Sequence, residues 1–189
     1  MNNLKKIYLN SWNYLCESKK EIYLVVGLFL FSVIIGFIFP SNFSSIERIL
    51  RELIEKTSGM SGIEITIFIF LNNLQSSFAG VILGAALGIF PIFTAILNGI
   101  VVGYVLAKSW SISGIAEFWR LLPHGIFELP ALFISLGMWV RLGDSIVNKK
   151  PWETFKSRFY YSMLVFLYIV LPLLLVAAII EGLLITFYR

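Results

Sequence analysis

The sequence is poor in the residue types that most catalytic and metal-binding sites need. Among its 189 residues there is one cysteine, Cys16, and one histidine, His124. A single cysteine excludes an internal disulfide and cannot by itself form a thiolate metal site. The glycines do not form a phosphate-binding loop, and no serine stands in a recognisable nucleophile context beside the histidine. An enzyme is therefore the class of protein that this sequence supports least.

Charged residues are also scarce, at 14% of the chain, whereas 58% of the residues are hydrophobic. A water-soluble domain of this composition would expose large apolar patches. The composition therefore indicates a multi-pass protein of the cell membrane. The net charge is +4, and the basic residues flank apolar segments, which favours contact with the lipid bilayer over nucleic acid. The first apolar run begins near Ile22 and has no small-residue cleavage site after it, so we expect no cleaved signal peptide.

Apolar segments of membrane-spanning length recur five times along the chain. Pro40 ends the first of them, and Pro172 predicts a kink in the last. Between the fourth and the fifth lies a segment, 141–158, that is expected to be a polar, basic loop. The sequence thus predicts an all-α polytopic bundle that forms a single domain over residues 1–189. The five predicted spans are 22–39, 63–88, 92–107, 123–140 and 160–187.

Two polar segments outside these spans have the pattern of surface helices. Residues 1–21 are basic and include Trp12, which is typical of a short interfacial helix. Residues 44–56 carry apolar side chains at the spacing of an amphipathic helix, and Ser44 with Glu47 forms a capping box. We predict that the second helix lies on the membrane surface or against the spans.

The distribution of basic residues predicts the orientation of the bundle. With five spans and the N-terminus inside, nine Lys and Arg fall in inner segments and six in outer ones, which favours this orientation. All five tryptophans fall near predicted span ends, as in an aromatic belt. Those expected at the inner boundary are Trp12, Trp139 and Trp152, and those at the outer boundary are Trp110 and Trp119.

Small residues recur along one ridge of the second predicted span and again on the third. In membranes, glycine lets helix backbones approach closely, so we interpret this pattern as helix packing. Because one small bundle needs less close-packing surface than the pattern offers, we also consider a homodimer. The glycines concerned are Gly80, Gly84, Gly88, Gly99 and Gly103.

Polar and acidic side chains that are unfavourable in lipid fall in the outer half of the predicted bilayer. A rise of about 1.5 Å per helical residue places His124 at the outer surface, Glu128 roughly 7 Å deep and Glu181 roughly 9 Å deep. The amides of the second and third spans come out roughly 14 Å deep on the same count. Since an acid facing lipid is expensive, we predict that these groups converge on one buried site. The predicted cluster comprises Asn72, Asn73, Asn98, His124, Glu128 and Glu181.

Three interpretations of this cluster stay open from the sequence. The side chains could pair with one another and lock the bundle. A divalent metal ion held by His124, Glu128 and Glu181 is an alternative, because imidazole and carboxylate groups suit zinc and similar ions. The cluster could also handle protons or ions, because two neighbouring buried carboxylates would share a proton.

The segment around His124 also carries a family resemblance. Residues 123–131, with the sequence PHGIFELPA, resemble the signature of the stage II sporulation protein M family. Asn72-Asn73 and Asn98-Gly99, followed by Gly103, precede it in the order that this family shows. Within the segment, Pro123 is expected to open a helix that places His124 and Glu128 on one face.

The resemblance implies a polytopic membrane protein that, in spore formers, organises cell-wall-degrading partners during engulfment. Because fold transfers between relatives better than role does, the expected function is stated broadly. We expect a scaffold or assembly subunit that contacts other membrane or envelope proteins. The alternative is a channel or transporter for an ion, a lipid or a small solute that uses the polar cluster.

Overall fold

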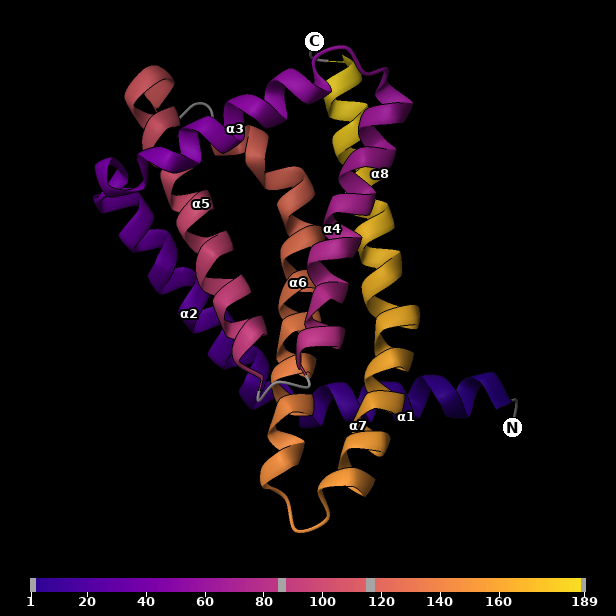
Figure 1. The fold of residues 1–189 in the computed structure, drawn as a ribbon. Coiled ribbons are helices and arrows are strands. Elements are labelled where there is room, and N and C mark those ends of the chain that lie inside the picture. Colours follow the sequence, from indigo (N-terminus) through magenta and orange to yellow (C-terminus); the bar gives the residue numbers. More distant parts are fainter. Residues whose placement is uncertain (1–2, 85–87, 115–117, 188–189) are drawn as a thin grey trace.

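A computed structural model describes residues 3–84, 88–114 and 118–187 of the chain, and the side chains of 3–4, 79–84, 113, 118–124 and 185–187 lie outside the description. Over this part the protein is all-α, as predicted (Figure 1). The bundle consists of α2 (Lys19–Ile38), α4 (Gly62–Gly84), α5 (Ile89–Ser113), α6 (Phe118–Gly143) and a long C-terminal helix. That last helix joins α7 (Pro151–Val165) to α8 (Leu171–Phe187) through a π-helical turn, Phe166–Val170.

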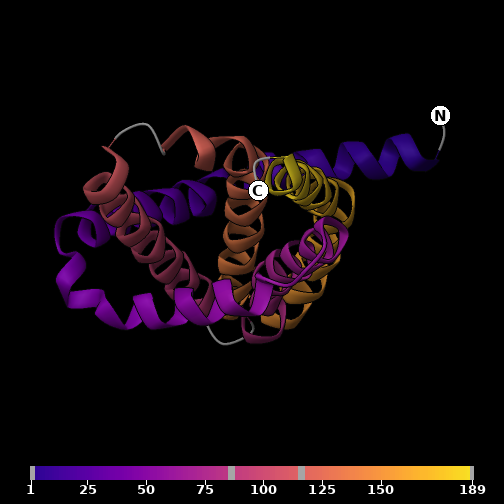
Figure 2. The same cartoon turned by 90° about the horizontal axis from the view of Figure 1, so that it is seen from above.

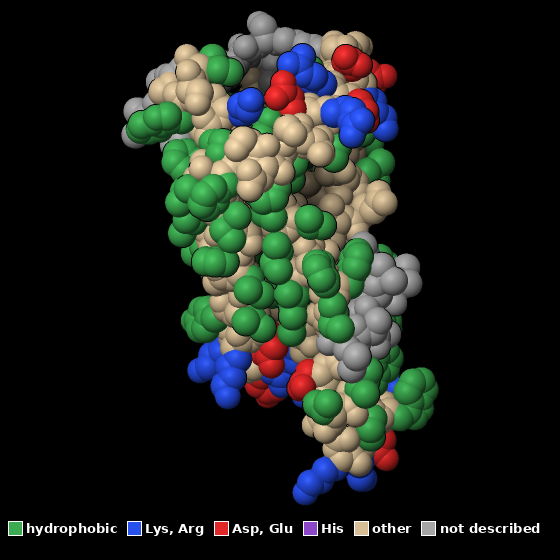
Figure 3. All heavy atoms as spheres, turned by 60° about the vertical axis from the view of Figure 1, so that its left-hand side comes forward, with side chains coloured by type: hydrophobic (Ala, Val, Ile, Leu, Met, Phe, Trp, Pro, Cys, Tyr) green, Lys and Arg blue, Asp and Glu red, His purple; other side chains and the backbone are tan. Residues whose placement is uncertain are grey.

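Four helices in the described part are long and apolar enough to cross a membrane, namely Lys19–Ile38, Ile89–Ile112, Gly125–Val147 and Pro151–Leu184. The prediction of a multi-pass membrane protein is confirmed. Helix α4 occupies the predicted 63–88 span and runs alongside α6 and α8 (Figure 1). Its role as a fifth crossing stays a prediction. Figure 3 shows hydrophobic side chains around the middle of the molecule and charged side chains toward both ends.

Two helices lie across opposite ends of the bundle (Figure 1). Helix α1 (Asn3–Glu17) forms within the predicted interfacial segment, and α3 (Ser44–Thr57) forms where the amphipathic helix was predicted. A short 3-10 helix, Pro40–Phe43, turns the chain from α2 into α3. Seen from above, α3 crosses from the α2 and α5 pair to the start of α4 (Figure 2). Each end of the bundle thus carries one surface helix.

Two helix boundaries differ from the sequence-based expectation. Helix α6 begins at Phe118, so Pro123 does not open it. Helix α6 continues to Gly143, a 3-10 helix covers Asp144–Val147 and α7 begins at Pro151, so the expected 141–158 loop is helical except at 148–150. Pro151 can open α7 because the N–H groups of the first helical turn have no partner within the helix. The π-helical turn ends two residues before Pro172. Because Pro172 has no N–H group to donate to the Tyr168 carbonyl, the helix is wider over this turn.

Helix α6 lies at the centre of the packing and contributes to both apolar clusters of the core. One cluster joins α6 to the long C-terminal helix and includes Leu142, Phe166 and Leu174. The other joins α6 to α2 and α5 and includes Val25 and Leu136. Because one helix supplies both clusters, the two sides of the bundle are held together through α6.

Trp139 corrects the predicted aromatic belt. Its side chain is fully buried in the first core cluster, so it does not lie at the membrane boundary. The reason is that α6 continues to Gly143 and α7 starts early, so both helices extend past this residue. Trp12, Trp110 and Trp152 are exposed, as a belt requires, whereas the side chain of Trp119 lies outside the described residues.

Glycine joins α2 to α5 backbone to backbone. A Cβ atom at Gly99 would lie 2.5 Å from the carbonyl oxygen of Phe29, and one at Gly103 would overlap that of Val33. These two glycines therefore pack against another helix of the same chain, so they do not support a homodimer. Gly88 follows α4 instead of lying on its ridge, and its φ of 69° suits the turn into α5. Packing at Gly80 and Gly84 lies outside the described residues.

Candidate functional site

A polar cavity of about 100 Å³ lies where α4, α5, α6 and α8 meet. Two apolar residues, Leu132 and Leu174, form part of its wall, and the rest of the lining is polar. Helix α4 supplies most of the polar groups, and α5 and α6 supply one each. These groups are Asn72, Asn73, Ser76, Ser77, Asn98 and Glu128.

The wall of the cavity is fixed by hydrogen bonds that tie α4 to α6. The backbone carbonyl of Ser77 accepts hydrogen bonds from the hydroxyl of Ser135 at 2.6 Å and from the indole N–H of Trp139 at 2.9 Å. The same indole N–H also contacts the Ser135 hydroxyl at 2.9 Å. All three residues are buried, so these hydrogen bonds are shielded from water and hold the two helices in register.

Two polar groups of the lining differ in whether they have a hydrogen-bond partner. The side-chain amide of Asn98 donates to the carbonyl of Thr94, one turn earlier on α5, at 2.8 Å. The hydroxyl of Ser77 is buried and has no hydrogen-bond partner among the described residues. A buried hydroxyl of this kind normally finds a partner, so the cavity wall has capacity for a small polar guest such as water.

The structure brings four of the six predicted cluster residues to this cavity: Asn72, Asn73, Asn98 and Glu128. Glu181 lines a different cavity, of about 320 Å³, beneath the apolar face of α3. The side chain of His124 lies outside the described residues. Both glutamates are partly buried, so neither is fully withdrawn from solvent or lipid.

The predicted metal set is not assembled by the side chains that the structure describes. Among them, no group of three His, Cys, Asp or Glu residues is arranged to hold a metal ion. Glu128 and Glu181 line separate cavities, so they do not face one common centre. With His124 outside the description, a metal on His124, Glu128 and Glu181 stays a prediction.

Sequence reasoning missed the contribution of Ser77 and Ser135. Ser77 follows Asn73 by four residues, which places both on one face of α4, and this spacing could have revealed it. Ser135 carries no such signal, because its role depends on the contact of α6 with α4. Buried serines are common in membrane helices, and their partners are set by tertiary packing.

These features define a helical, multi-pass membrane protein with a small polar cavity at the junction of its central helices. Residues 25–184 match the Stage II sporulation protein M family, and the chain belongs to this family. An uncharacterized protein of Methanocaldococcus jannaschii is 32% identical over 181 residues, which cover 88% of this chain and 81% of that protein. No solved structure matches the chain. The resemblance drawn from residues 123–131 is confirmed.

Proposed function

We propose that the chain is an assembly subunit of a membrane complex, and that its polar cavity stabilises the bundle. The observation that carries this proposal is the size of the cavity, about 100 Å³. A water molecule occupies about 30 Å³, so the cavity has room for about three of them. Sites for lipids and drug-sized solutes start at about 300 Å³. A polar space this small fits a structural role better than the binding of a large cargo.

The chemistry of the lining also fits a structural role. Hydrogen bonds from Ser135 and Trp139 on α6 to the Ser77 carbonyl on α4 join two helices that have no hydrophobic drive to associate in lipid. Each such interhelical hydrogen bond is worth about 0.6 kcal/mol, and several together fix the rotation of the helices. The result is a rigid bundle that positions its two end helices, α1 and α3, for contact with partners.

The end helices expose side chains suited to such contacts. On α1, Tyr8, Leu9 and Trp12 are about half exposed, and on α3 Ile49 and Ile54 are more than half exposed. Both helices lie across the bundle instead of along it (Figure 1). A protein with one such surface at each face of the membrane is suited to hold partners on both sides.

A second function, the passage of a small cation or proton, is favoured by one observation. The carboxylate of Glu128 and three amides line the same cavity, and such oxygen atoms are suitable ligands for a small cation. The small volume of the cavity favours an ion over a lipid as the cargo of this site. The two functions therefore differ in whether the Glu128 charge moves an ion or only stabilises the fold.

The substitution Glu128→Gln separates these functions, because it removes the charge and keeps the shape. For an assembly subunit we expect a lower thermal unfolding midpoint and an unchanged complex on native gels of membranes from the source organism. The matched control is Glu52→Gln on the exposed face of α3, which should change neither. Ion flux through proteoliposomes of the purified wild-type chain, abolished by Glu128→Gln while the protein stays folded, would show that the scaffold proposal is wrong.

A further inference from the structure

A second polar hollow, of about 580 Å³, lies where α1 meets the hairpin formed by α6 and α7. It is separate from the family motif and from the cavity of Glu128. From the groups that line it, we infer that this hollow binds a phosphate-bearing anion, such as the phosphodiester headgroup of an acidic lipid. The groups used in the argument are Asn13, Arg141, Thr154, Ser157 and Arg158.

Two arginines form the charged wall of the hollow. The side chain of Arg141 is 15% exposed and that of Arg158 is 17% exposed. A guanidinium group stays protonated in proteins, so both positive charges persist despite this burial. Arginine also recognises phosphate through two parallel N–H donors, which a lysine cannot offer.

The arginines are held in place by contacts that leave donors available. Arg141 lies over the ring of Tyr14, with 5.0 Å between the guanidinium carbon and the ring centroid. Arg158 donates to the backbone carbonyl of Arg141. The Nε atom of Arg141 is buried without a hydrogen-bond partner among the described residues. The guanidinium groups are thus positioned before any ligand arrives, which lowers the entropic cost of binding.

Carboxylates near the hollow offset part of its charge. Glu17 pairs with Arg141 at 2.9 Å and Asp144 pairs with Arg158 at 3.3 Å. The side chains of Glu17 and Asp144 are 64% and 51% exposed, so water screens them more than it screens the buried arginines. Lys150 and Glu153 form an exposed pair on the rim, 3.2 Å apart, that adds no net charge. The lining itself holds three cations and two carboxylates, which leaves a charge of +1.

Uncharged donors complete the lining. The side chains of Asn10, Asn13, Thr154, Ser157 and Tyr161 all carry amide or hydroxyl donors. Phosphate has several oxygen acceptors, and these side chains add neutral donors to the N–H groups of the arginines. A hollow of about 580 Å³ falls in the range of small-molecule sites, so a headgroup fits within it.

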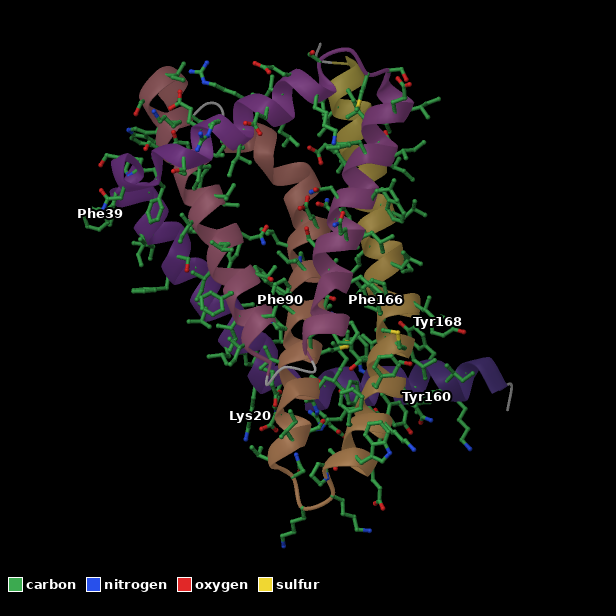
Figure 4. All side chains as sticks on the ribbon, in the orientation of Figure 1. Lys20, Phe39, Phe90, Tyr160, Phe166 and Tyr168 are labelled. Atoms are coloured by element: carbon green, nitrogen blue, oxygen red, sulfur yellow. The ribbon has the colours of Figure 1, made fainter. Side chains whose placement is uncertain are left out.

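The place of the hollow in the molecule favours a lipid as the source of this phosphate. Helix α1 lies across this end of the bundle, and Trp12 and Trp152 are exposed there, as at a membrane boundary (Figure 1). Tyr160 lies at the level of α1, and Lys20 also lies toward this end (Figure 4). By sequence, the segments at this end hold nine basic and four acidic residues, which leaves a charge of +5. Basic pockets at this level of a bundle attract acidic headgroups.

Native mass spectrometry of the detergent-solubilised full chain tests this inference. We expect the wild type to retain phosphatidylglycerol in preference to phosphatidylcholine. Ser157→Asp places a competing negative charge in the hollow at an exposed position, and we expect it to weaken phosphatidylglycerol binding by about tenfold, the loss of one charge-assisted hydrogen bond. The matched control is Ser41→Asp, which makes the same charge change at the opposite end and should have no effect.

Two further measurements identify the source of the phosphate and check that the variants fold. Saturable binding of inorganic phosphate, lost in Ser157→Asp, would assign the hollow to a soluble phosphate ester, whereas binding of the lipid alone would assign it to the membrane. Arg158→Gln should weaken either ligand, and circular dichroism checks that it folds. Equal losses in Ser157→Asp and Ser41→Asp, or no preference for phosphatidylglycerol together with no phosphate binding, would overturn the inference.

Discussion

The carboxylate of Glu47 on α3 accepts a hydrogen bond from the hydroxyl of Tyr104 on α5, with 3.1 Å between the oxygen atoms. The same carboxylate oxygen lies 3.4 Å from the ammonium group of Lys108, one turn further along α5. Its other oxygen accepts from Arg51 at 2.7 Å. Glu47 therefore ties the amphipathic helix to the end of α5 across 57 residues of sequence, and this tie determines how α3 covers the bundle.

Glu47→Gln is expected to loosen α3 without unfolding the bundle. The amide keeps the size of the side chain but loses the charge on which both cations and the Tyr104 hydroxyl depend. We expect hydrogen exchange of α3 backbone amides to become several-fold faster, while that of α6 stays the same. Glu52→Gln, on the same helix and exposed, serves as the control. Unchanged exchange in α3 would mean that apolar contacts alone hold this helix.

The contact made by Glu47 is also expected to be insensitive to pH over the physiological range. Hydrogen bonds from Arg51, Tyr104 and Lys108 lower the pKa of the Glu47 carboxyl from its usual 4.5 to about 2. A carboxyl whose pKa is lowered by folding stabilises the folded form above its usual pKa, and this stabilisation is lost as the pH falls through the lowered value. A spin label at Glu52→Cys, in a Cys16→Ser background, should stay equally immobile down to a pH near 4.5 and gain mobility as the pH falls toward 2. Release of α3 above this window would contradict the assignment.

The helical fold could be predicted from the sequence because lipid restricts the choice of structure. Backbone groups in a bilayer have no water to bind, so long apolar segments form helices. Segment 44–56 was equally clear, since its apolar residues follow the period of a helix and its start carries a capping box. Even Gly99 and Gly103 were recognised as packing residues, although the sequence did not show that their partner is α2.

The placement of Glu181 and Trp139 could not be predicted in this way. Depth along a helix follows from residue number, but the direction in which a side chain points depends on the rotation of that helix in the bundle. Glu181 and Glu128 come out at similar depths from the sequence, yet they line different cavities. Trp139 lies near the end of a predicted span, yet tertiary packing buries it against Ser77. Both depend on contacts between helices that a sequence pattern does not contain.

The α2–α5 contact predicts a sharp difference between two glycines. A Cβ atom at Gly103 would overlap the Val33 carbonyl oxygen and lie 2.8 Å from the Phe37 nitrogen, so Gly103→Ala must push two backbones apart. Overpacking of this kind costs about 1–3 kcal/mol, and rigid backbone atoms place this site at the upper end. We expect a clearly lower thermal unfolding midpoint by circular dichroism in detergent.

Gly27→Ala is the matched control for this substitution, because it changes the same residue type on α2. A Cβ atom at Gly27 meets nothing within 4 Å. Alanine is the better helix former by about 0.5–1 kcal/mol, so the variant should unfold at the same temperature as wild type or slightly higher. Equal destabilisation by both variants would show that close packing at the α2–α5 contact does not set the effect.

The single cysteine makes the orientation of the bundle directly measurable. Cys16 is exposed on α1, at the end whose segments hold nine basic and four acidic residues. By sequence, the predicted outer segments hold six basic and four acidic residues, which gives a charge of +2 against +5. Because basic segments stay on the cytoplasmic side, we expect a membrane-impermeant maleimide to label Cys16 only after intact cells are permeabilised.

In the double variant Cys16→Ser and Ser41→Cys, the thiol lies at the far end of α2 and should be labelled in intact cells. Labelling of both positions from outside would mean that α2 does not cross the membrane, and the reverse pattern would place α1 and its hollow outside the cell.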